Sequence, residues 1–183
     1  MARSAPPPLA TAALPTAALD AAPAPLAFEP AKPEPPIPAP GQLSLGVLND
    51  VLGYHVAQAA VTTYATFERY IGEPYGLRKV EYSLLMLVLA NGPLSPKRLG
   101  QALALSAPNL TLLLDRLQQR GLIRRERSTL DGRSQNIVLT DTGRQMADDT
   151  AATAEPMEAE LSGRLSRAER LMLIELLRKV AGR

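Results

Sequence analysis

The fold is decided by residues 95–140, which read SPKRLGQALALSAPNLTLLLDRLQQRGLIRRERSTLDGRSQNIVLT. Ser95 followed by a proline predicts the N-cap and first turn of a short helix. Ser106 predicts the N-cap of a second helix, and Gly121 predicts its end. One face of this second helix is apolar at helical spacing, which predicts a buried stripe formed by Leu110, Leu113, Leu114 and Leu117.

A two-stranded ribbon is predicted directly after the second helix. The segments 122–127 and 135–140 have the pattern of short strands, and Asp131-Gly132 between them is a strong signal for a tight hairpin turn. A helix, a turn, a second helix and a ribbon in this order form a helix-turn-helix with a wing. That arrangement places the second helix in the major groove of DNA.

Two helices are predicted before this stretch. Residues 43–70 carry apolar side chains at helical spacing and predict one long helix, with Gly72 and Pro74 as stop signals. A helix of this length with apolar side chains on more than one side needs a partner beyond its own domain. A nearly apolar core helix is predicted at about 78–90, and Asn91-Gly92-Pro93 ends it.

Two further helices are predicted after the ribbon. Thr140 is the expected N-cap of a polar helix that runs to about Leu161 and is interrupted near Pro156. Residues 166–169 form a capping box before a leucine-rich helix at 171–180. The predicted fold class is therefore mainly α with a small β-ribbon wing, a winged helix-turn-helix with long helices at both ends.

The N-terminal segment has a different composition from the rest of the chain. Residues 1–40 hold 12 of the 17 prolines and 13 alanines. Proline removes backbone donors, and the few large apolar residues do not offset the entropy of ordering. We therefore expect a disordered tail rich in polyproline II, without the apolar core of a signal peptide. Residues 41–183 are then a single domain.

Composition also excludes several classes of protein. The chain has no cysteine, which excludes disulfides, thiolate metal sites and thiol-based redox sensing. No apolar run reaches the roughly 18 residues of a membrane span, so a cytoplasmic protein is expected. His55 is the single histidine, and no catalytic triad, phosphate-binding glycine loop or metal-ligand spacing accompanies it. The sequence predicts neither an enzyme nor a bound cofactor or metal.

Positive charge is concentrated in one part of the chain. The net charge is only +2, yet residues 97–133 hold eight basic residues against three acidic ones. Such a segment is typical of a protein that binds a polyanion, although a solvated surface would carry the same pattern.

The winged segment resembles the MarR family of bacterial transcription regulators. Four motifs carry the resemblance in register, namely Thr-x-x-x-Asp-Arg-Leu (111–117), Gly-Leu-Ile-x-Arg (121–125), Asp-x-Arg (131–133) and Leu-Thr-x-x-Gly (139–143). The helical layout extends the resemblance to about residues 42–181. Each motif is weak alone, and the combination is specific.

The resemblance implies an intertwined homodimer that binds double-stranded DNA at a pseudo-palindromic operator. It places the dimerisation helices at 41–76 and 144–183 and the DNA-binding lobe at 77–143. It also implies a repressor that a small, often aromatic, effector releases from DNA. The operator sequence, the effector, the sign of regulation and the role of the tail are not encoded in any recognisable motif.

Candidate DNA-reading residues follow from the recognition helix predicted between Ser106 and Gly121. Its outward face offers Ser106, as a helix cap or a DNA contact, with Pro108, Asn109, Thr111, Leu112 and Arg116. Asparagine pairs with adenine, and arginine pairs with guanine or phosphate. Leu112 departs from the family pattern, in which a basic or small residue is usual, and suits either a thymine methyl or a neighbouring side chain.

The wing and the preceding helix supply further candidates. Arg133 is expected in the minor groove, and Asp131 is expected either to orient an arginine or to form the turn. Arg124, Arg125 and Arg127 are expected to contact phosphates or to support the wing, and Lys97 and Arg98 suit the DNA backbone.

A ligand site is expected among the aromatic residues. Six of the seven aromatics lie between residues 54 and 82, the region that the resemblance assigns to the effector pocket. The candidate lining residues are Tyr54, Tyr64, Phe67 and Tyr82, with His55 and Arg69 to hold a carboxylate. The alternative is that these aromatics only fill the core and an interface.

The alternative to a DNA-binding regulator is a winged-helix module that binds proteins and no DNA. The outward arginines at 116 and 133 favour DNA, because a protein-binding wing would not need both.

Overall fold

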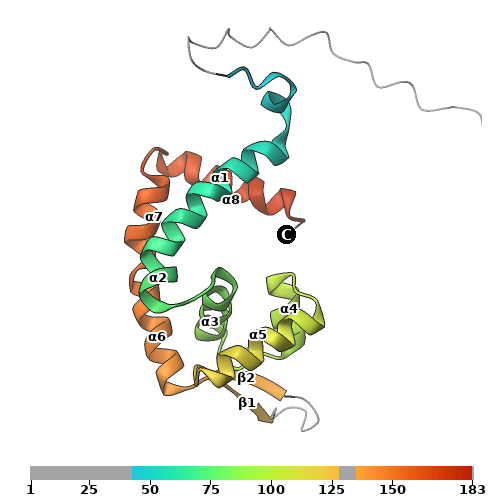
Figure 1. Cartoon of the computed structure of the whole chain (residues 1–183), viewed down its shortest axis with the longest axis vertical. Coiled ribbons are helices and arrows are strands. Elements are labelled where there is room, and N and C mark those ends of the chain that lie inside the picture. The colour runs from blue at the N-terminus through green and yellow to red at the C-terminus, as the bar shows by residue number, and fades with distance from the viewer. Residues whose placement is uncertain (1–42, 128–134, 183) are drawn as a thin grey trace, which may run out of the picture. The chain divides into compact units, whose positions relative to one another are not determined.

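The computed structural model describes residues 43–127 and 135–182 (Figure 1). The chain divides into two units, Met1–Gly46 and Val47–Arg183, and the second unit holds all of the α-helices and strands discussed below. The proline-rich tail and the Asp131-Gly132 turn lie outside the described residues. Within the described ranges, no helix is both long enough and apolar enough to cross a membrane.

The described unit is mainly helical, with one two-stranded antiparallel sheet, as predicted. The elements in chain order are the 3-10 helix η1 (Gly46–Asp50), α1 (Leu52–Phe67), the π-helix η2 (Glu68–Gly72), α2 (Glu73–Tyr75), α3 (Lys79–Asn91), α4 (Pro96–Leu103), α5 (Ala107–Gln119), β1 (Ile123–Arg127), β2 (Gln135–Leu139), α6 (Asp141–Ala152), α7 (Ala154–Ser162) and α8 (Arg167–Val180).

The first helical segment differs from the prediction at both ends. The α-helix begins only at Leu52, because Gly46 has a φ of +52° and Val51 is extended. At its other end the helical path continues through η2 and α2, so Gly72 and Pro74 do not stop it. Pro74, which has no N–H to donate to the preceding turn, directly follows the π-helix η2 in this continuous helical path. Gly76, with a φ of +60°, ends this segment.

The helix-turn-helix forms largely as the sequence predicts. The Ser95 hydroxyl accepts a hydrogen bond from the Arg98 N–H, and Pro96 opens α4. The predicted leucine stripe of α5 is confirmed, since all four leucines are buried. The prediction for Ser106 is confirmed only in part. Ser106 lies at the N-cap of α5, but its side chain makes no capping hydrogen bond. One reason is that Pro108 stands at the second helical position and has no N–H to donate.

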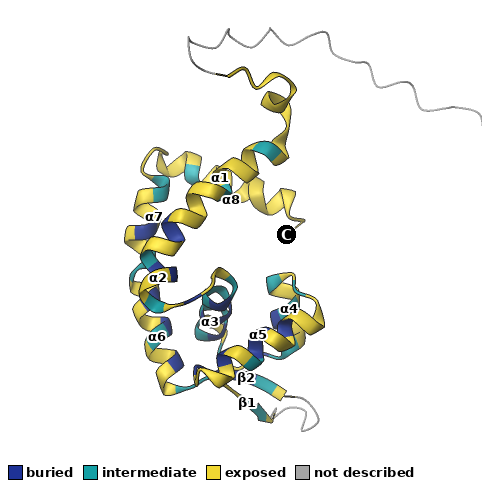
Figure 2. Ribbon diagram, viewed as in Figure 1, coloured by how far each residue is buried: buried dark blue, intermediate teal, exposed yellow. Residues whose placement is uncertain are grey.

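The ribbon is joined closely to the two helices. The strands pair from Ile123 opposite Leu139 to Arg127 opposite Gln135, which matches the predicted strands to within a residue. Leu94, just before α4, adds a short bridge to Ile137 through two backbone hydrogen bonds. The core of this region gathers buried side chains from α3, α4, α5 and both strands (Figure 2).

The start of α6 holds the base of the ribbon. The Thr140 hydroxyl accepts a hydrogen bond from the Gly143 N–H and donates one to the Gly121 carbonyl. The backbone of Gly143 lies so close to the Leu122 carbonyl that a Cβ there would lie 1.8 Å from its oxygen. The Leu-Thr-x-x-Gly motif therefore holds the end of the recognition helix against the start of α6.

The last helices follow the prediction with shifted boundaries. The break in the long polar helix falls at Thr153, three residues before Pro156, because a proline ring clashes with the carbonyl four residues earlier. The predicted capping box of Ser166 and Glu169 is confirmed, and it starts α8 at Arg167, a turn before the predicted start at Leu171. No residue of α8 is buried (Figure 2).

Candidate DNA-binding interface

The N-terminal half of α5 presents an exposed face beside the ribbon. Pro108, Asn109 and Thr111 are exposed on it, and Leu112 leaves 65% of its surface exposed. The Thr111 hydroxyl donates to the Ala107 carbonyl at 3.0 Å, so its oxygen lone pairs stay available as acceptors. This face carries an amide, a hydroxyl and an apolar side chain, which are the groups that read base edges.

Arg125 ties the recognition helix to the ribbon. Its guanidinium, on β1, donates to the Asp115 carboxylate at 2.5 Å and to the Gln118 amide oxygen at 2.7 Å, both on α5. Of the two roles expected for Arg125, this geometry favours support of the wing. The aspartate at 131 was expected to orient an arginine, and it lies outside the described residues together with Arg133.

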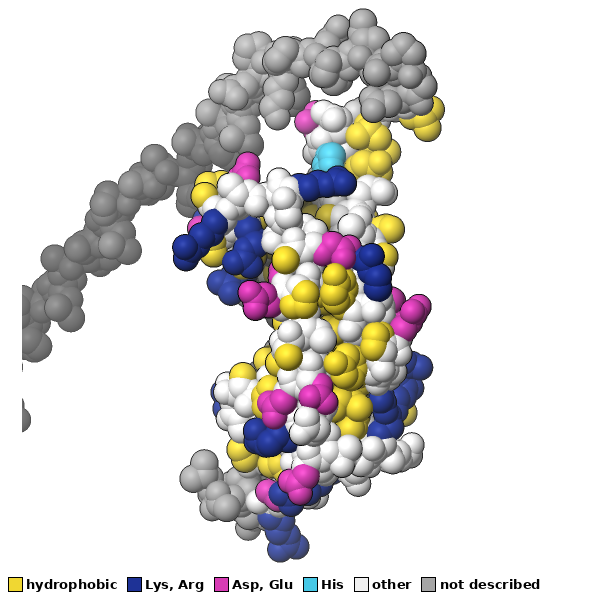
Figure 3. Space-filling model, turned by 90° about the vertical axis from the view of Figure 1, so that its left-hand side faces the viewer, with side chains coloured by type: hydrophobic (Ala, Val, Ile, Leu, Met, Phe, Trp, Pro, Cys, Tyr) yellow, Lys and Arg dark blue, Asp and Glu magenta, His cyan; other side chains and the backbone are white. Residues whose placement is uncertain are grey.

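The remaining basic candidates lie at the surface. Arg124 pairs with Glu126 on the same face of β1 at 2.6 Å, and Arg127 is exposed at the end of that strand. Lys97 and Arg98 are exposed in the first turn of α4. A group of basic side chains is visible at the ribbon end of the described unit (Figure 3).

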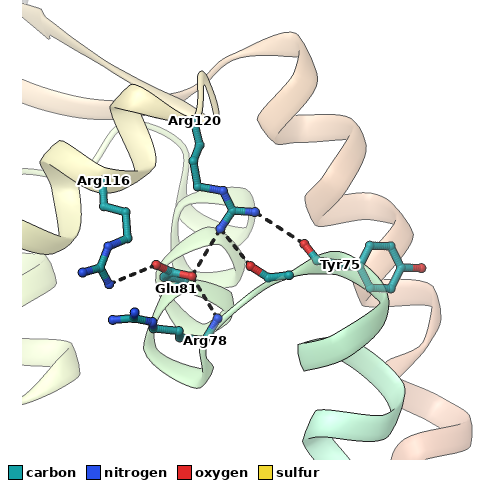
Figure 4. Close-up of polar contacts among 6 residues, drawn as sticks. Tyr75, Arg78, Glu81, Arg116 and Arg120 are labelled. Atoms are coloured by element: carbon teal, nitrogen blue, oxygen red, sulfur yellow. Dashed lines mark hydrogen bonds and ion pairs between the residues drawn. The ribbon is translucent and has the colours of Figure 1, made fainter.

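Arg116 is engaged within the protein. It was predicted as an outward DNA contact, and 45% of its side chain is exposed, but its Nη1 lies 3.6 Å from Oε1 of Glu81 on α3. Arg120, one turn further along, lies 3.3 Å from Oε2 of the same carboxylate (Figure 4). Neither Glu81 nor Arg120 was predicted from the sequence as a functional residue. The available signal was an acidic residue in an otherwise apolar helix, which needs a basic partner when buried.

A cavity of about 490 Å³ lies between α4 and α5. It brings together three of the predicted DNA-binding residues, Lys97, Thr111 and Arg125, around an apolar floor that includes Leu110 and Leu114.

The aromatic candidates for a ligand site do not form one cluster. The rings of Phe67 and Tyr82 lie 5.7 Å apart, and Lys79 Nζ lies 3.7 Å from the ring centre of Tyr64. Burial, with a further contribution from the negative charge of Glu158, raises the pKa of Tyr82. Tyr54 and His55 form a separate pair near the start of α1, and His55 Nε2 lies 2.9 Å from the Asn49 carbonyl oxygen.

Arg69, expected to hold a carboxylate of the ligand, is paired with Glu160 of α7. A hydrogen bond with the same Glu160 carboxylate raises the pKa of Tyr70, the neighbour of Arg69.

An apolar groove runs between α1 and α8. Its volume is about 490 Å³, and Val56, Ala59, Leu173, Leu176 and Leu177 are among its lining residues. Most of α1 and nearly all of α8 are exposed around it (Figure 2).

The helix pair, the ribbon and the exposed α5 face define a winged helix-turn-helix protein of the DNA-binding class. A family model described as the MarR family matches residues 75–134. The chain is 31% identical to the transcriptional regulator YkoM of Bacillus subtilis over 105 residues, which cover 57% of this chain and 68% of YkoM. It is also 27% identical to a protein of Thauera aromatica named for regulation of the hcr operon, over 76% of this chain and 84% of that protein.

Solved structures give the same result. The repressor CouR, bound to a 23-mer DNA duplex, superposes with a TM-score of 0.70 at 30% identity, over 76% of this chain and 99% of CouR. CouR has also been solved bound to p-coumaroyl-CoA. The chain therefore belongs to the MarR family and is a DNA-binding transcriptional regulator. Its relatives are transcriptional regulators rather than enzymes.

Proposed function

We propose that the protein is a homodimeric repressor that binds a pseudo-palindromic operator and leaves it when a small effector binds. The observation that carries the DNA-binding part is the exposed face of α5, where Asn109, Thr111 and Leu112 stand beside the ribbon. In this proposal the α5 face enters the major groove, Lys97, Arg98 and Arg127 contact phosphates, and Arg133 reaches the minor groove.

The dimer is supported by the apolar surface of the terminal helices. Six of the fourteen residues of α8 are charged, and Glu175, Arg178 and Lys179 lie on one side of it. Its seven large apolar residues are all exposed in the single chain. The groove between α1 and α8 involves only part of the apolar surface of α8, because Met172 and Ile174 do not line it. A row of exposed apolar side chains of this extent marks a surface that a protein partner covers. A second copy of the chain is the occupant we propose.

The effector is proposed from chemistry and from one relative. CouR has been solved bound to p-coumaroyl-CoA, and 98% of CouR matches 76% of this chain. In this chain, Tyr64, Phe67 and Tyr82 lie where the C-terminal part of α1 meets α3, next to the DNA-binding helices. Tyrosine offers an apolar face and a hydroxyl, which suits an aromatic acid or its thioester.

Binding to the DNA upstream of the protein's own gene tests the proposal. We expect the purified protein to shift this DNA as a dimer and to protect two half-sites about one helical turn apart, in a gel shift followed by footprinting. A panel of aromatic acids and aryl thioesters should then contain a compound that weakens binding. A single unpaired half-site would contradict the dimer, and binding unchanged by every compound would contradict the effector.

A further inference from the structure

Arg120 is the C-cap residue of the recognition helix, and its side chain points away from the exposed reading face. Its Nη1 donates to the Gly76 carbonyl at 3.0 Å and to Glu81 Oε2 at 3.3 Å, while Nη2 donates to the Tyr75 carbonyl at 3.4 Å (Figure 4). One guanidinium therefore binds three acceptors on another part of the chain. Only 32% of the Arg120 side chain is exposed.

The acceptors of Arg120 are held rigidly. Only 2% of Glu81 is exposed, and its Oε2 also accepts the Arg78 N–H at 2.9 Å, which fixes the carboxylate at the start of α3. Removing one partner of a buried carboxylate is costly, because the buried charge is then left uncompensated. Arg116 adds a second positive charge from α5 at 3.6 Å. Two arginines one turn apart on α5 thus converge on a single buried anion.

Both ends of this contact lie next to turns. Gly76, in the left-handed conformation, joins α2 to α3, and Gly121, with a φ of +68°, follows Arg120 directly and leads into β1. The two arginine-bound carbonyls belong to the turn that continues from the aromatic α1–α2 segment. Arg120 therefore connects that turn to the point where the recognition helix ends.

We propose that Arg120 is a positioning residue for DNA reading, which sets the orientation of α5 through Glu81 and the Gly76 carbonyl. The inference rests on the operator binding proposed above. Base reading depends on the angle of α5 in the groove, whereas non-specific binding depends mainly on the number of positive charges. A change that keeps the charge of Arg120 but loses its fixed geometry should lower specific binding alone.

The variant Arg120→Lys distinguishes an effect on specific binding from an effect on non-specific binding. Lysine keeps the positive charge but cannot donate to three acceptors in the planar fork of a guanidinium. Fluorescence anisotropy with the operator duplex and with a scrambled duplex of equal length gives both affinities over a series of salt concentrations. We expect the operator affinity to fall about tenfold, with the affinity for scrambled DNA and the salt slope unchanged. Arg164→Lys, at an exposed arginine between α7 and α8, should change neither affinity.

Other roles of Arg120 give different results. If Arg120 bound a phosphate, Arg120→Lys would keep most of the affinity, and Arg120→Gln would lower binding to both duplexes and reduce the salt slope by about one. If it only stabilised the fold, the melting temperature would fall while the ratio of the two dissociation constants, measured well below melting, stayed that of the wild type. Either result would overturn the proposal.

Glu81→Gln supplies a second route to the same test. It should lower the ratio of operator to scrambled affinity as Arg120→Lys does, and the double variant should lose little more than the more affected single variant. Additive losses would contradict action through Glu81. A wild-type protein that did not distinguish operator from scrambled DNA would instead contradict the proposed operator binding, so the two failures are distinguishable.

Discussion

Asp115 of the recognition helix accepts a hydrogen bond from Arg125 of the first ribbon strand at 2.5 Å. The pair joins the helix proposed to enter the major groove to the strand that leads into the wing. Because both side chains are partly exposed, the ion pair contributes at most about 1 kcal/mol to stability. Its larger role is to keep the ribbon at a fixed angle to α5.

We therefore expect Asp115→Ala to affect DNA binding more than folding. The melting temperature should change by only a few degrees, at about 1 kcal/mol or less, while operator affinity falls about tenfold because the wing is no longer fixed. Thermal unfolding and anisotropy on the same preparation measure the two effects. Equal operator affinity in the variant and the wild type would contradict this role.

Gly143→Ala is expected to be severely destabilising. The added methyl would lie 1.8 Å from the Leu122 carbonyl oxygen, so α6 and the base of the ribbon would have to separate. A loss of about 3 kcal/mol or more is expected by chemical denaturation. Gly53→Ala is the matched control, since its Cβ would meet nothing within 4 Å in α1. It should be neutral or stabilising by about 1 kcal/mol. A similar loss of stability in both variants would contradict the role of the close contact between Gly143 and Leu122.

We expect the capping contact of Glu169 to make the stability of the folded protein depend on pH. The Ser166 backbone N–H, followed by the Ser166 hydroxyl, lowers the pKa of Glu169 below its ordinary value of 4.5. A group whose pKa is lowered on folding stabilises the folded state above its unfolded pKa, and this contribution is lost as the pH falls through the folded pKa. Glu169→Gln should therefore melt below the wild type at neutral pH, and the two melting temperatures should converge below pH 4.5. A constant difference across this range would contradict the capping role.

Met172→Glu tests the proposed dimer. Met172 has 63% of its surface exposed in the single chain, so the folded protomer should tolerate a carboxylate there. In the proposed dimer the same carboxylate would be buried without a partner, which is costly. We expect a monomer by light scattering, with circular dichroism close to that of the wild type. Glu175→Gln, on the charged side of α8, should remain a dimer, and a dimeric Met172→Glu would exclude this part of α8 from the interface.

The features predicted correctly from the sequence are those encoded within one turn of helix or one hairpin. The leucine stripe follows from spacing alone, and the Thr140 and Ser166 caps follow from neighbouring residues. The Ser106 cap was wrong as a side-chain contact because Pro108 removes one of the expected donors. The start of the first α-helix was wrong because a left-handed Gly46 and an extended Val51 precede it.

The contacts that hold the candidate interface together could not be predicted in the same way. Glu81 and Arg120 are 39 positions apart, and the residues around each of them do not indicate the other as its partner. Arg116 was predicted as an outward arginine and its side chain is 45% exposed, but its ion pair with Glu81 was not predicted, because helical periodicity does not reveal which helix packs beside α5. Pairing between distant elements depends on tertiary packing, which a single sequence does not display.

In the proposed function, the exposed face of α5 reads base edges in an operator. Asn109→Ala tests it most directly, because it removes an amide that can pair with adenine and leaves every described ion pair in place. In anisotropy titrations, operator affinity should fall by about tenfold or more, while affinity for a scrambled duplex and the salt slope stay those of the wild type. Equal affinity of Asn109→Ala and wild type for the operator would contradict the account.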